Sequence, residues 1–125
     1  MKADAFISFL PSEDLDRSAD FYERVLGLSL TVDQGACRIY RVTDTAFLGV
    51  CLREPFEGPA GAVTTIVVDD VDGWCERVLA EGWAVRGGPQ YSETYKIYHA
   101  YVDDPDGNVL EIQRFDDSNW RGLDT

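Results

Sequence analysis

The sequence predicts an α+β fold in which two βαβββ modules form a partly closed, mixed β-sheet barrel with the helices outside. The order strand, helix, three strands occurs twice along 125 residues, and both helical segments contain the stretch Glu-Arg-Val-Leu. A segment rich in Pro and Gly separates the two halves. We therefore expect a single domain over 1–125, with modules at 1–55 and 62–115 and an acidic tail at 116–125.

Each module contains one amphipathic helix. The first begins after Asp14, a favoured N-cap residue, and ends at Gly27, which tolerates the left-handed backbone of a helix terminus. The second begins after Asp70 and ends at Gly82. Apolar residues recur at helical spacing on one face of each helix: Leu15, Ala19, Tyr22, Val25 and Leu26 in the first, and Val71, Trp74, Cys75, Val78 and Leu79 in the second.

Segments with alternating polarity or with β-branched and aromatic residues predict the strands. The sequence Asp-Asp-Pro-Asp-Gly-Asn at 103–108 predicts a tight turn, because Pro presets its own backbone angle and Gly adopts a positive φ. The expected strands are Ala5–Leu10, Ser29–Asp33, Cys37–Val42, Phe47–Arg53, Val63–Val68, a short Trp83–Arg86, Ile97–Val102 and Val109–Phe115.

Composition and charge exclude several classes of function. The 23 acidic and 11 basic residues give a net charge of −12, which would repel a nucleic acid backbone. No apolar run approaches the roughly 18 residues of a membrane helix, and no export signal is visible, so we expect a soluble cytoplasmic protein. The three cysteines are an odd number without Cys-x-x-Cys spacing, which favours reduced thiols over a disulfide framework or a structural zinc site.

Three stretches in this order resemble the vicinal oxygen chelate superfamily, which groups glyoxalases, extradiol dioxygenases and bleomycin-resistance proteins. They are DLDRSADFYERVLGL near the start, VVDDVDGWCERVLAEG in the middle and DPDGNVLEI near the end, and together they span nearly the whole chain. The resemblance implies the paired βαβββ fold. It also implies a homodimer, a state that would cover the exposed sheet edges.

The resemblance also implies where a metal would bind in metal-dependent relatives. Equivalent points on the first and fourth strands of the two halves are Ile7, Gly49, Val63 and Glu111, of which only Glu111 carries a ligating side chain. A shift of the register by one residue gives Ser8 and Thr64, which are poor ligands. A catalytic divalent ion needs at least three imidazole or carboxylate donors, so we expect neither a metal nor another cofactor.

Strand alternation predicts which side chains line the cavity between the modules. We expect a mostly apolar site with a few polar groups, as small-molecule sites usually have. Glu111, His99 and Tyr101 are the candidates for catalysis. Two structural alternatives are that Glu111 pairs with Arg41 and that His99 hydrogen-bonds a neighbouring residue. The predicted ligand-binding residues are Phe9, Arg41, Phe47, Thr65, His99, Tyr101, Glu111 and Gln113.

Two functions remain open. The first is a metal-free protein, resembling the bleomycin-resistance branch, that binds a small molecule, with a cation as one option, in the cavity between the modules. The second is a metal-independent lyase or isomerase that uses Glu111 and His99 on a small oxygenated substrate. In the tail, Trp120 has three possible roles: closing over the pocket, contacting a second subunit, or lying exposed without fixed structure.

Overall fold

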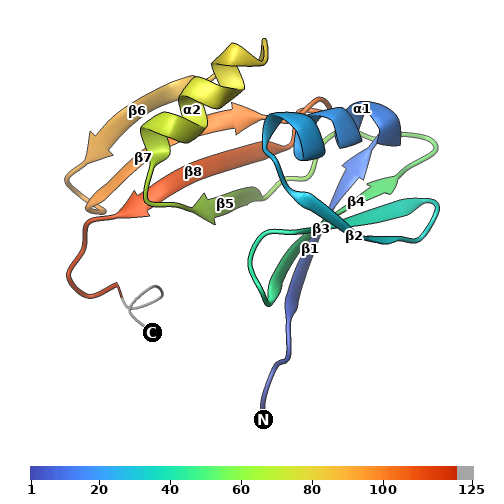
Figure 1. The fold of residues 1–125 in the computed structure, drawn as a ribbon, viewed down its shortest axis with the longest axis horizontal. Coiled ribbons are helices and arrows are strands. Elements are labelled where there is room, and N and C mark those ends of the chain that lie inside the picture. The colour runs from blue at the N-terminus through green and yellow to red at the C-terminus, as the bar shows by residue number, and fades with distance from the viewer. Residues whose placement is uncertain (121–125) are drawn as a thin grey trace. The chain divides into compact units, whose positions relative to one another are not determined.

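The computed structural model describes residues 1–120. They separate into two units, one of Met1–Ala62 with Asp104–Val109 and one of Val63–Asp103 with the chain from Leu110. Each unit contains one four-stranded sheet, with the order strand, helix, three strands along the chain (Figure 1). The predicted α+β fold of two repeated modules is therefore confirmed. The end of the predicted tail, 121–125, lies outside the described residues.

In the first unit the sheet has the order β1-β4-β3-β2, so β1 and β2 are its edges. β1 runs parallel to β4, and the other two pairs are antiparallel. The elements are β1 (Phe6–Ser12), α1 (Leu15–Ala19), η1 (Asp20–Val25), β2 (Ser29–Asp33), β3 (Cys37–Arg41) and β4 (Ala46–Leu52).

The first helix changes from α to π geometry halfway along, so that the N–H of Leu26 donates to the carbonyl of Phe21, five residues earlier (2.9 Å). The wider turn brings Phe21 into the core beside Tyr22 and Val25, and all three are fully buried. Leu15, which the helical spacing placed in the buried stripe, is only half-buried.

Two cysteines of the first sheet form a disulfide, so the prediction of three reduced thiols is wrong for Cys37 and Cys51. The antiparallel register of β3 and β4 places these residues directly opposite each other on the same face, with their Cα atoms 4.1 Å apart. The cysteine argument for a reducing compartment therefore does not hold for this pair. Cys75 is a buried free thiol, as expected.

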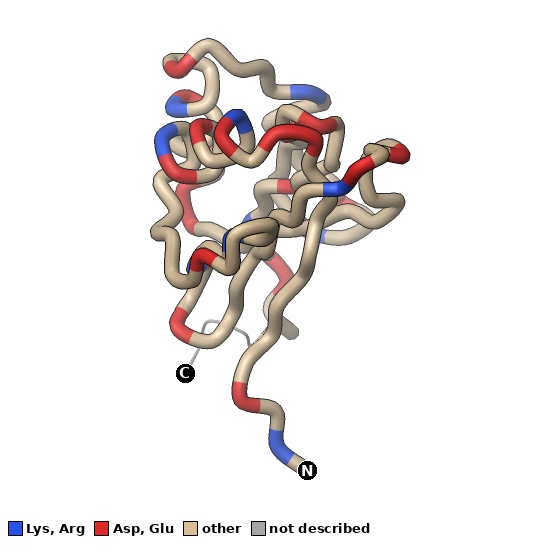
Figure 2. Tube along the Cα trace, turned by 90° about the vertical axis from the view of Figure 1, so that its right-hand side faces the viewer, with Lys and Arg blue, Asp and Glu red and all other residues tan. Residues whose placement is uncertain are grey.

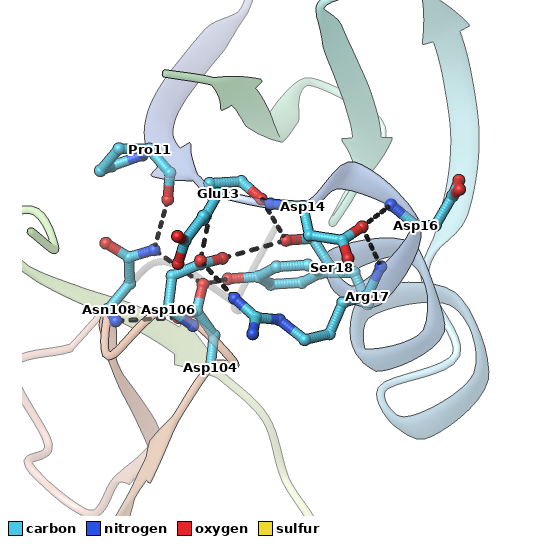
Figure 3. Close-up of polar contacts among 11 residues, drawn as sticks. Pro11, Glu13, Asp14, Asp16, Arg17, Ser18, Asp104, Asp106 and Asn108 are labelled. Atoms are coloured by element: carbon cyan, nitrogen blue, oxygen red, sulfur yellow. Dashed lines mark hydrogen bonds and ion pairs between the residues drawn. The ribbon is translucent and has the colours of Figure 1, made fainter. Parts of the chain in front are cut away.

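Most of the predicted turn at 103–108, from Asp104 to Asn108, belongs to the first unit, where three of its side chains are buried (Figure 3). The carboxylate of Asp104 accepts from the Tyr22 hydroxyl (2.7 Å) and from both nitrogens of Asn108 (2.8 Å each). Burial raises the pKa of Asp104, although these hydrogen bonds oppose the shift, and burial raises the pKa of Tyr22 well above its ordinary value. Asn108 also donates to the carbonyl of Pro11 (3.0 Å).

In the second unit the sheet has the order β5-β8-β7-β6. The prediction of a short strand at Trp83–Arg86 is wrong, since β6 begins at Arg86 and continues through Gly87, Gly88 and Pro89. The Gly and Pro residues concealed this strand, but it lies at the sheet edge, where Pro and an irregular register are tolerated. The elements are β5 (Val63–Val67), α2 (Val71–Ala80), β6 (Arg86–Ser92), β7 (Ile97–Asp103) and β8 (Val109–Phe115).

The helix of the second unit follows its predicted pattern except at its end. The carboxylate of Asp70 caps it by accepting from the N–H of Gly73 (2.9 Å). Val71, Cys75 and Val78 are buried, whereas Leu79 is exposed, so its predicted place in the buried stripe is wrong. Among the described residues, neither helical segment has the length and apolar character needed to cross a bilayer.

Acidic positions recur along the described trace of both units (Figure 2). Some of them form exposed ion pairs with arginine, such as Asp20 with Arg24 and Asp116 with Arg114. These arginines lower the pKa of both carboxyl groups. Because the acidic positions are spread along the described chain, the net charge by itself does not mark a binding site.

Candidate functional site

The open face of the second sheet carries a pocket of about 330 Å³. Strands β7 and β8 supply most of its wall, because every second residue of each strand points to this face. The intervening residues point the other way, and four of them are fully buried: Ala100, Val102, Leu110 and Ile112. The pocket is lined by Tyr95, Ile97, His99, Tyr101, Glu111, Gln113 and Phe115.

A histidine and a carboxylate form a hydrogen-bonded pair in this pocket. Nδ1 of His99 lies 2.7 Å from Oε2 of Glu111, and both side chains are 11% exposed. A buried carboxylate requires such partners, because removing its charge from water is costly. The structural alternative for Glu111 names Arg41, a residue of the first unit, and stays a prediction; within the second unit, Glu111 pairs with His99. The alternative for His99, a hydrogen bond to a neighbouring residue, corresponds to the same contact.

Two further side chains hold the carboxylate of Glu111. The hydroxyl of Thr65, on β5, donates to Oε1 (2.8 Å). The amide of Gln113, with its nitrogen facing the carboxylate, donates to Oε1 (2.9 Å) and Oε2 (3.2 Å). Three strands therefore fix one carboxylate, and of the predicted polar residues the structure brings together Thr65, His99, Glu111 and Gln113.

An aromatic ring beside the pair completes this part of the wall. The ring of Tyr101 packs edge-on against His99, with centroids 5.4 Å apart. The guanidinium of Arg86 lies 5.5 Å from the Tyr101 ring centroid and forms two hydrogen bonds with Asp103 (2.7 and 3.1 Å). The bonds to Asp103 raise the pKa of Arg86 above its ordinary value. A cation of the chain therefore already lies over the Tyr101 ring.

Sequence reasoning missed two aromatic residues of the wall. Phe115 lines the pocket and stacks on Trp120, with centroids 4.1 Å apart and ring planes inclined by 16°. Trp120 therefore contacts a residue of the pocket wall. Tyr95 is 70% exposed and lies in the turn before β7. The density of tyrosines at 91–101 was the one signal for it.

The remaining predicted ligand-binding residues lie in the first unit. Phe9 is 48% exposed, and its ring covers Gly49. A side chain at position 49 would collide with the Phe9 ring. Arg41 lies over the ring of Phe47, with its guanidinium carbon 5.0 Å from the ring centroid, and donates to the carbonyl of Asp44 (3.1 Å). These three residues form part of the open face of the first sheet.

The four positions at which metal-dependent relatives were expected to bind an ion do not fit one. Ile7, Gly49 and Val63 have no donor atom, and both oxygens of Glu111 already accept hydrogen bonds. Within the described residues, no three His, Cys, Asp or Glu side chains lie close enough together to hold a metal. A divalent ion bound through one occupied carboxylate would lack the three protein donors that such sites use.

Comparison with known proteins finds relatives over most of the chain. Residues 5–112 match the family model of the Glyoxalase/Bleomycin resistance protein/Dioxygenase superfamily. A protein from Vibrio cholerae named "Probable lactoylglutathione lyase" is 30% identical over 114 residues, which cover 79% of this chain and 81% of that protein.

Solved structures show the same fold. TnmS3, an antibiotic binding protein from a Streptomyces species, has a TM-score of 0.75 and 26% identity, covering 90% of this chain and 96% of its own. TioX from a Micromonospora species has the same TM-score and 21% identity, covering 90% and 98%. The family match, the Vibrio relative and these structures lead to one conclusion: the chain belongs to the glyoxalase/bleomycin resistance protein/dioxygenase superfamily.

Proposed function

We propose that this protein binds a small, largely apolar or aromatic molecule in the pocket of the second sheet, without a metal ion. The observation that carries the proposal is the pocket itself, in which apolar and aromatic side chains surround one hydrogen-bonded pair, His99 and Glu111. A wall of this composition around a few oriented polar groups is typical of small-molecule sites. The similarity to a protein named as antibiotic binding supports the same class of function.

The absence of a metal is part of this proposal. It is supported by the donor set, because Glu111 is the single ligating side chain at the four family positions and its oxygens are engaged. Binding measured after dialysis against a chelator should equal binding before it. Loss of binding that added Zn²⁺, Ni²⁺ or Mn²⁺ restores would contradict the metal-free site.

A ligand screen tests the binding function. Thermal shift with a library of aromatic and polycyclic compounds should identify molecules that stabilise the protein, because a ligand of the folded state raises its stability. Tyr95→Ala removes an exposed part of the pocket wall and should weaken each hit. Tyr91→Ala is the matched control, since Tyr91 is 49% exposed and does not line the pocket. Equal loss in both variants would show that the hits bind elsewhere.

A second candidate function is proton transfer, favoured by the 2.7 Å contact between His99 and Glu111. A carboxylate that orients an imidazole is the arrangement in which histidine acts as a general base. Incubation with small ketones in D₂O tests this candidate, because a base that abstracts a proton next to a carbonyl incorporates deuterium there. Incorporation that disappears in His99→Asn would support catalysis; none with any substrate would leave binding as the function.

A further inference from the structure

The carboxylate of Glu111 has no remaining capacity to bind a ligand. An ionised carboxylate has about four acceptor sites. Four contacts occupy them: Thr65 at 2.8 Å, His99 at 2.7 Å, and the Gln113 amide at 2.9 and 3.2 Å. A cationic ligand that paired with Glu111 would have to displace at least one of these donors, whose own hydrogen bonds would then be lost.

The same contacts fix the tautomer of the neutral His99 ring. Because the carboxylate only accepts, the hydrogen in the short contact belongs to Nδ1 of the imidazole. In the neutral ring, Nε2 then carries a lone pair and is an acceptor. Nε2 has no hydrogen bond to any of the residues that the structure describes, and His99 lines the pocket. Within the His99–Glu111 pair, the polar atom that remains for a ligand is therefore the acceptor Nε2.

The two contacts near His99 that a positively charged ligand group would use already have partners within the chain. Tyr101, the aromatic neighbour of His99, already has the Arg86 guanidinium over its ring. A cation over this ring would compete with the guanidinium, and direct contact with the Glu111 carboxylate would displace one of its hydrogen-bond donors, although the carboxylate keeps its negative charge. Ile97 and Phe115, also in the wall, offer apolar contact only.

We infer that the pocket recognises a neutral aromatic molecule through a hydroxyl or N–H group that donates to Nε2 of His99, while Glu111 positions the imidazole without touching the ligand. This inference rests on the proposed function, that the pocket binds a small molecule. It differs from the cationic ligand that the first of the two open functions included. A phenol on a fused-ring frame combines the required donor with a size suited to a pocket of about 330 Å³.

The protonation of His99 can be measured directly, because the chain has a single histidine. In protein labelled with [¹⁵N]histidine, the two ring nitrogens give one pair of signals, whose shifts and couplings distinguish the tautomers. We expect the hydrogen on Nδ1 at neutral pH. A hydrogen on Nε2, or on both nitrogens, would overturn the inference whether or not any ligand binds.

Three matched probes test the ligand chemistry: 2-naphthol, its methyl ether 2-methoxynaphthalene, and the cation 2-naphthylmethylammonium. We expect 2-naphthol to bind about fivefold more tightly than the ether, the factor that corresponds to a net hydrogen bond of about 1 kcal/mol. The cation should bind most weakly, and 2-naphthol should shift the Nε2 signal. Equal binding of phenol and ether, or preference for the cation, would overturn the inference and leave the binding function intact.

Variants of His99 separate recognition from folding. His99→Asn keeps an N–H donor near the position of Nδ1, toward Glu111, and removes the atom at the position of Nε2, so the phenol should lose its advantage over the ether. His99→Gln places a polar atom near Nε2 and should retain part of that advantage. An unchanged preference in His99→Asn would overturn the inference. If none of the probes binds the wild-type protein, the proposed pocket function fails as well.

Discussion

The buried carboxylate of Asp106 is the best single test of how the first unit is held together. Its side chain is fully buried and accepts three hydrogen bonds: from the backbone N–H of Glu13 (3.0 Å), Nη2 of Arg17 (2.8 Å) and the hydroxyl of Ser18 (3.2 Å) (Figure 3). These contacts join the turn at Asp104–Asn108 to the start of the first helix. Asp106→Ala removes all three, and Asp106→Asn keeps the shape but removes the charge.

The contacts differ in what they contribute. Arg17 is 44% exposed and can return to water, so its ion pair contributes at most about 1 kcal/mol. The hydroxyl of Ser18 keeps a second partner, Ser12, at 2.7 Å. The N–H of Glu13 would lose its partner at a part-buried position, which costs about 1–3 kcal/mol. We therefore expect Asp106→Ala to lower the free energy of unfolding by about 3 kcal/mol, and Asp106→Asn by about 1 kcal/mol.

Equilibrium unfolding in urea, followed by far-UV circular dichroism and tryptophan fluorescence, measures both variants. Asp116→Ala is the control, because it removes an exposed ion pair with Arg114 and should change the free energy by less than about 0.5 kcal/mol. The reasoning is refuted if Asp106→Ala and the control are indistinguishable. If Asp106→Asn lowers the free energy of unfolding as much as Asp106→Ala does, then the negative charge of Asp106 contributes more to stability than its hydrogen-bonding geometry.

Three further outcomes follow from the structure. Gly88→Ala should lower the free energy of unfolding in urea by at least about 2 kcal/mol, because Gly88 has a φ of +142° and a Cβ there would lie 2.5 Å from a carbonyl oxygen of β7. In the control Gly61→Ala, the free energy of unfolding should change little, because the space around Gly61 is open. Titration of the denatured, unreduced protein should find one thiol. Replacing both Cys37 and Cys51 by Ser should lower the free energy of unfolding by about 3 kcal/mol, since the bridge joins cysteines with a sequence separation of 14. Burial raises the pKa of Tyr40 from 10 to about 12. The contribution of this shift to stability is therefore fully present below pH 10 and is lost as the pH rises toward 12. Unfolding midpoints measured across this range should fall less in Tyr40→Phe than in the wild-type protein.

Local patterns predicted most of the elements, because helix and strand periodicity are encoded in neighbouring residues. The exceptions have physical reasons. The π turn brought Phe21 into the core, and the Gly and Pro residues of β6 do not look like a strand until the sheet edge is known. The disulfide depends on the register between β3 and β4, which neither the odd cysteine count nor the spacing of Cys37 and Cys51 reveals.

The candidate site was predicted in part. Strand alternation correctly indicates that His99, Tyr101, Glu111 and Gln113 share one face of the sheet. Which of these side chains touch each other depends on distances that alternation does not contain. The pairing of Glu111 with His99 is therefore a result of the structure. The hydrogen bonds that occupy both oxygens of Glu111 likewise depend on distances that only the structure gives.

The two halves of the chain place different chemistry on equivalent open faces. In the first sheet, Ile39 lies opposite Gly49, the position equivalent to Glu111. The next pair on the same face is the disulfide of Cys37 and Cys51. In the second sheet, the corresponding region holds His99 bonded to Glu111 within an aromatic pocket. Because alternate residues of a strand face opposite sides, such substitutions leave the buried, helix-facing core unchanged. A few open-face positions can therefore change the ligand while the fold is kept, which is why relatives with TM-scores near 0.75 need not share a ligand.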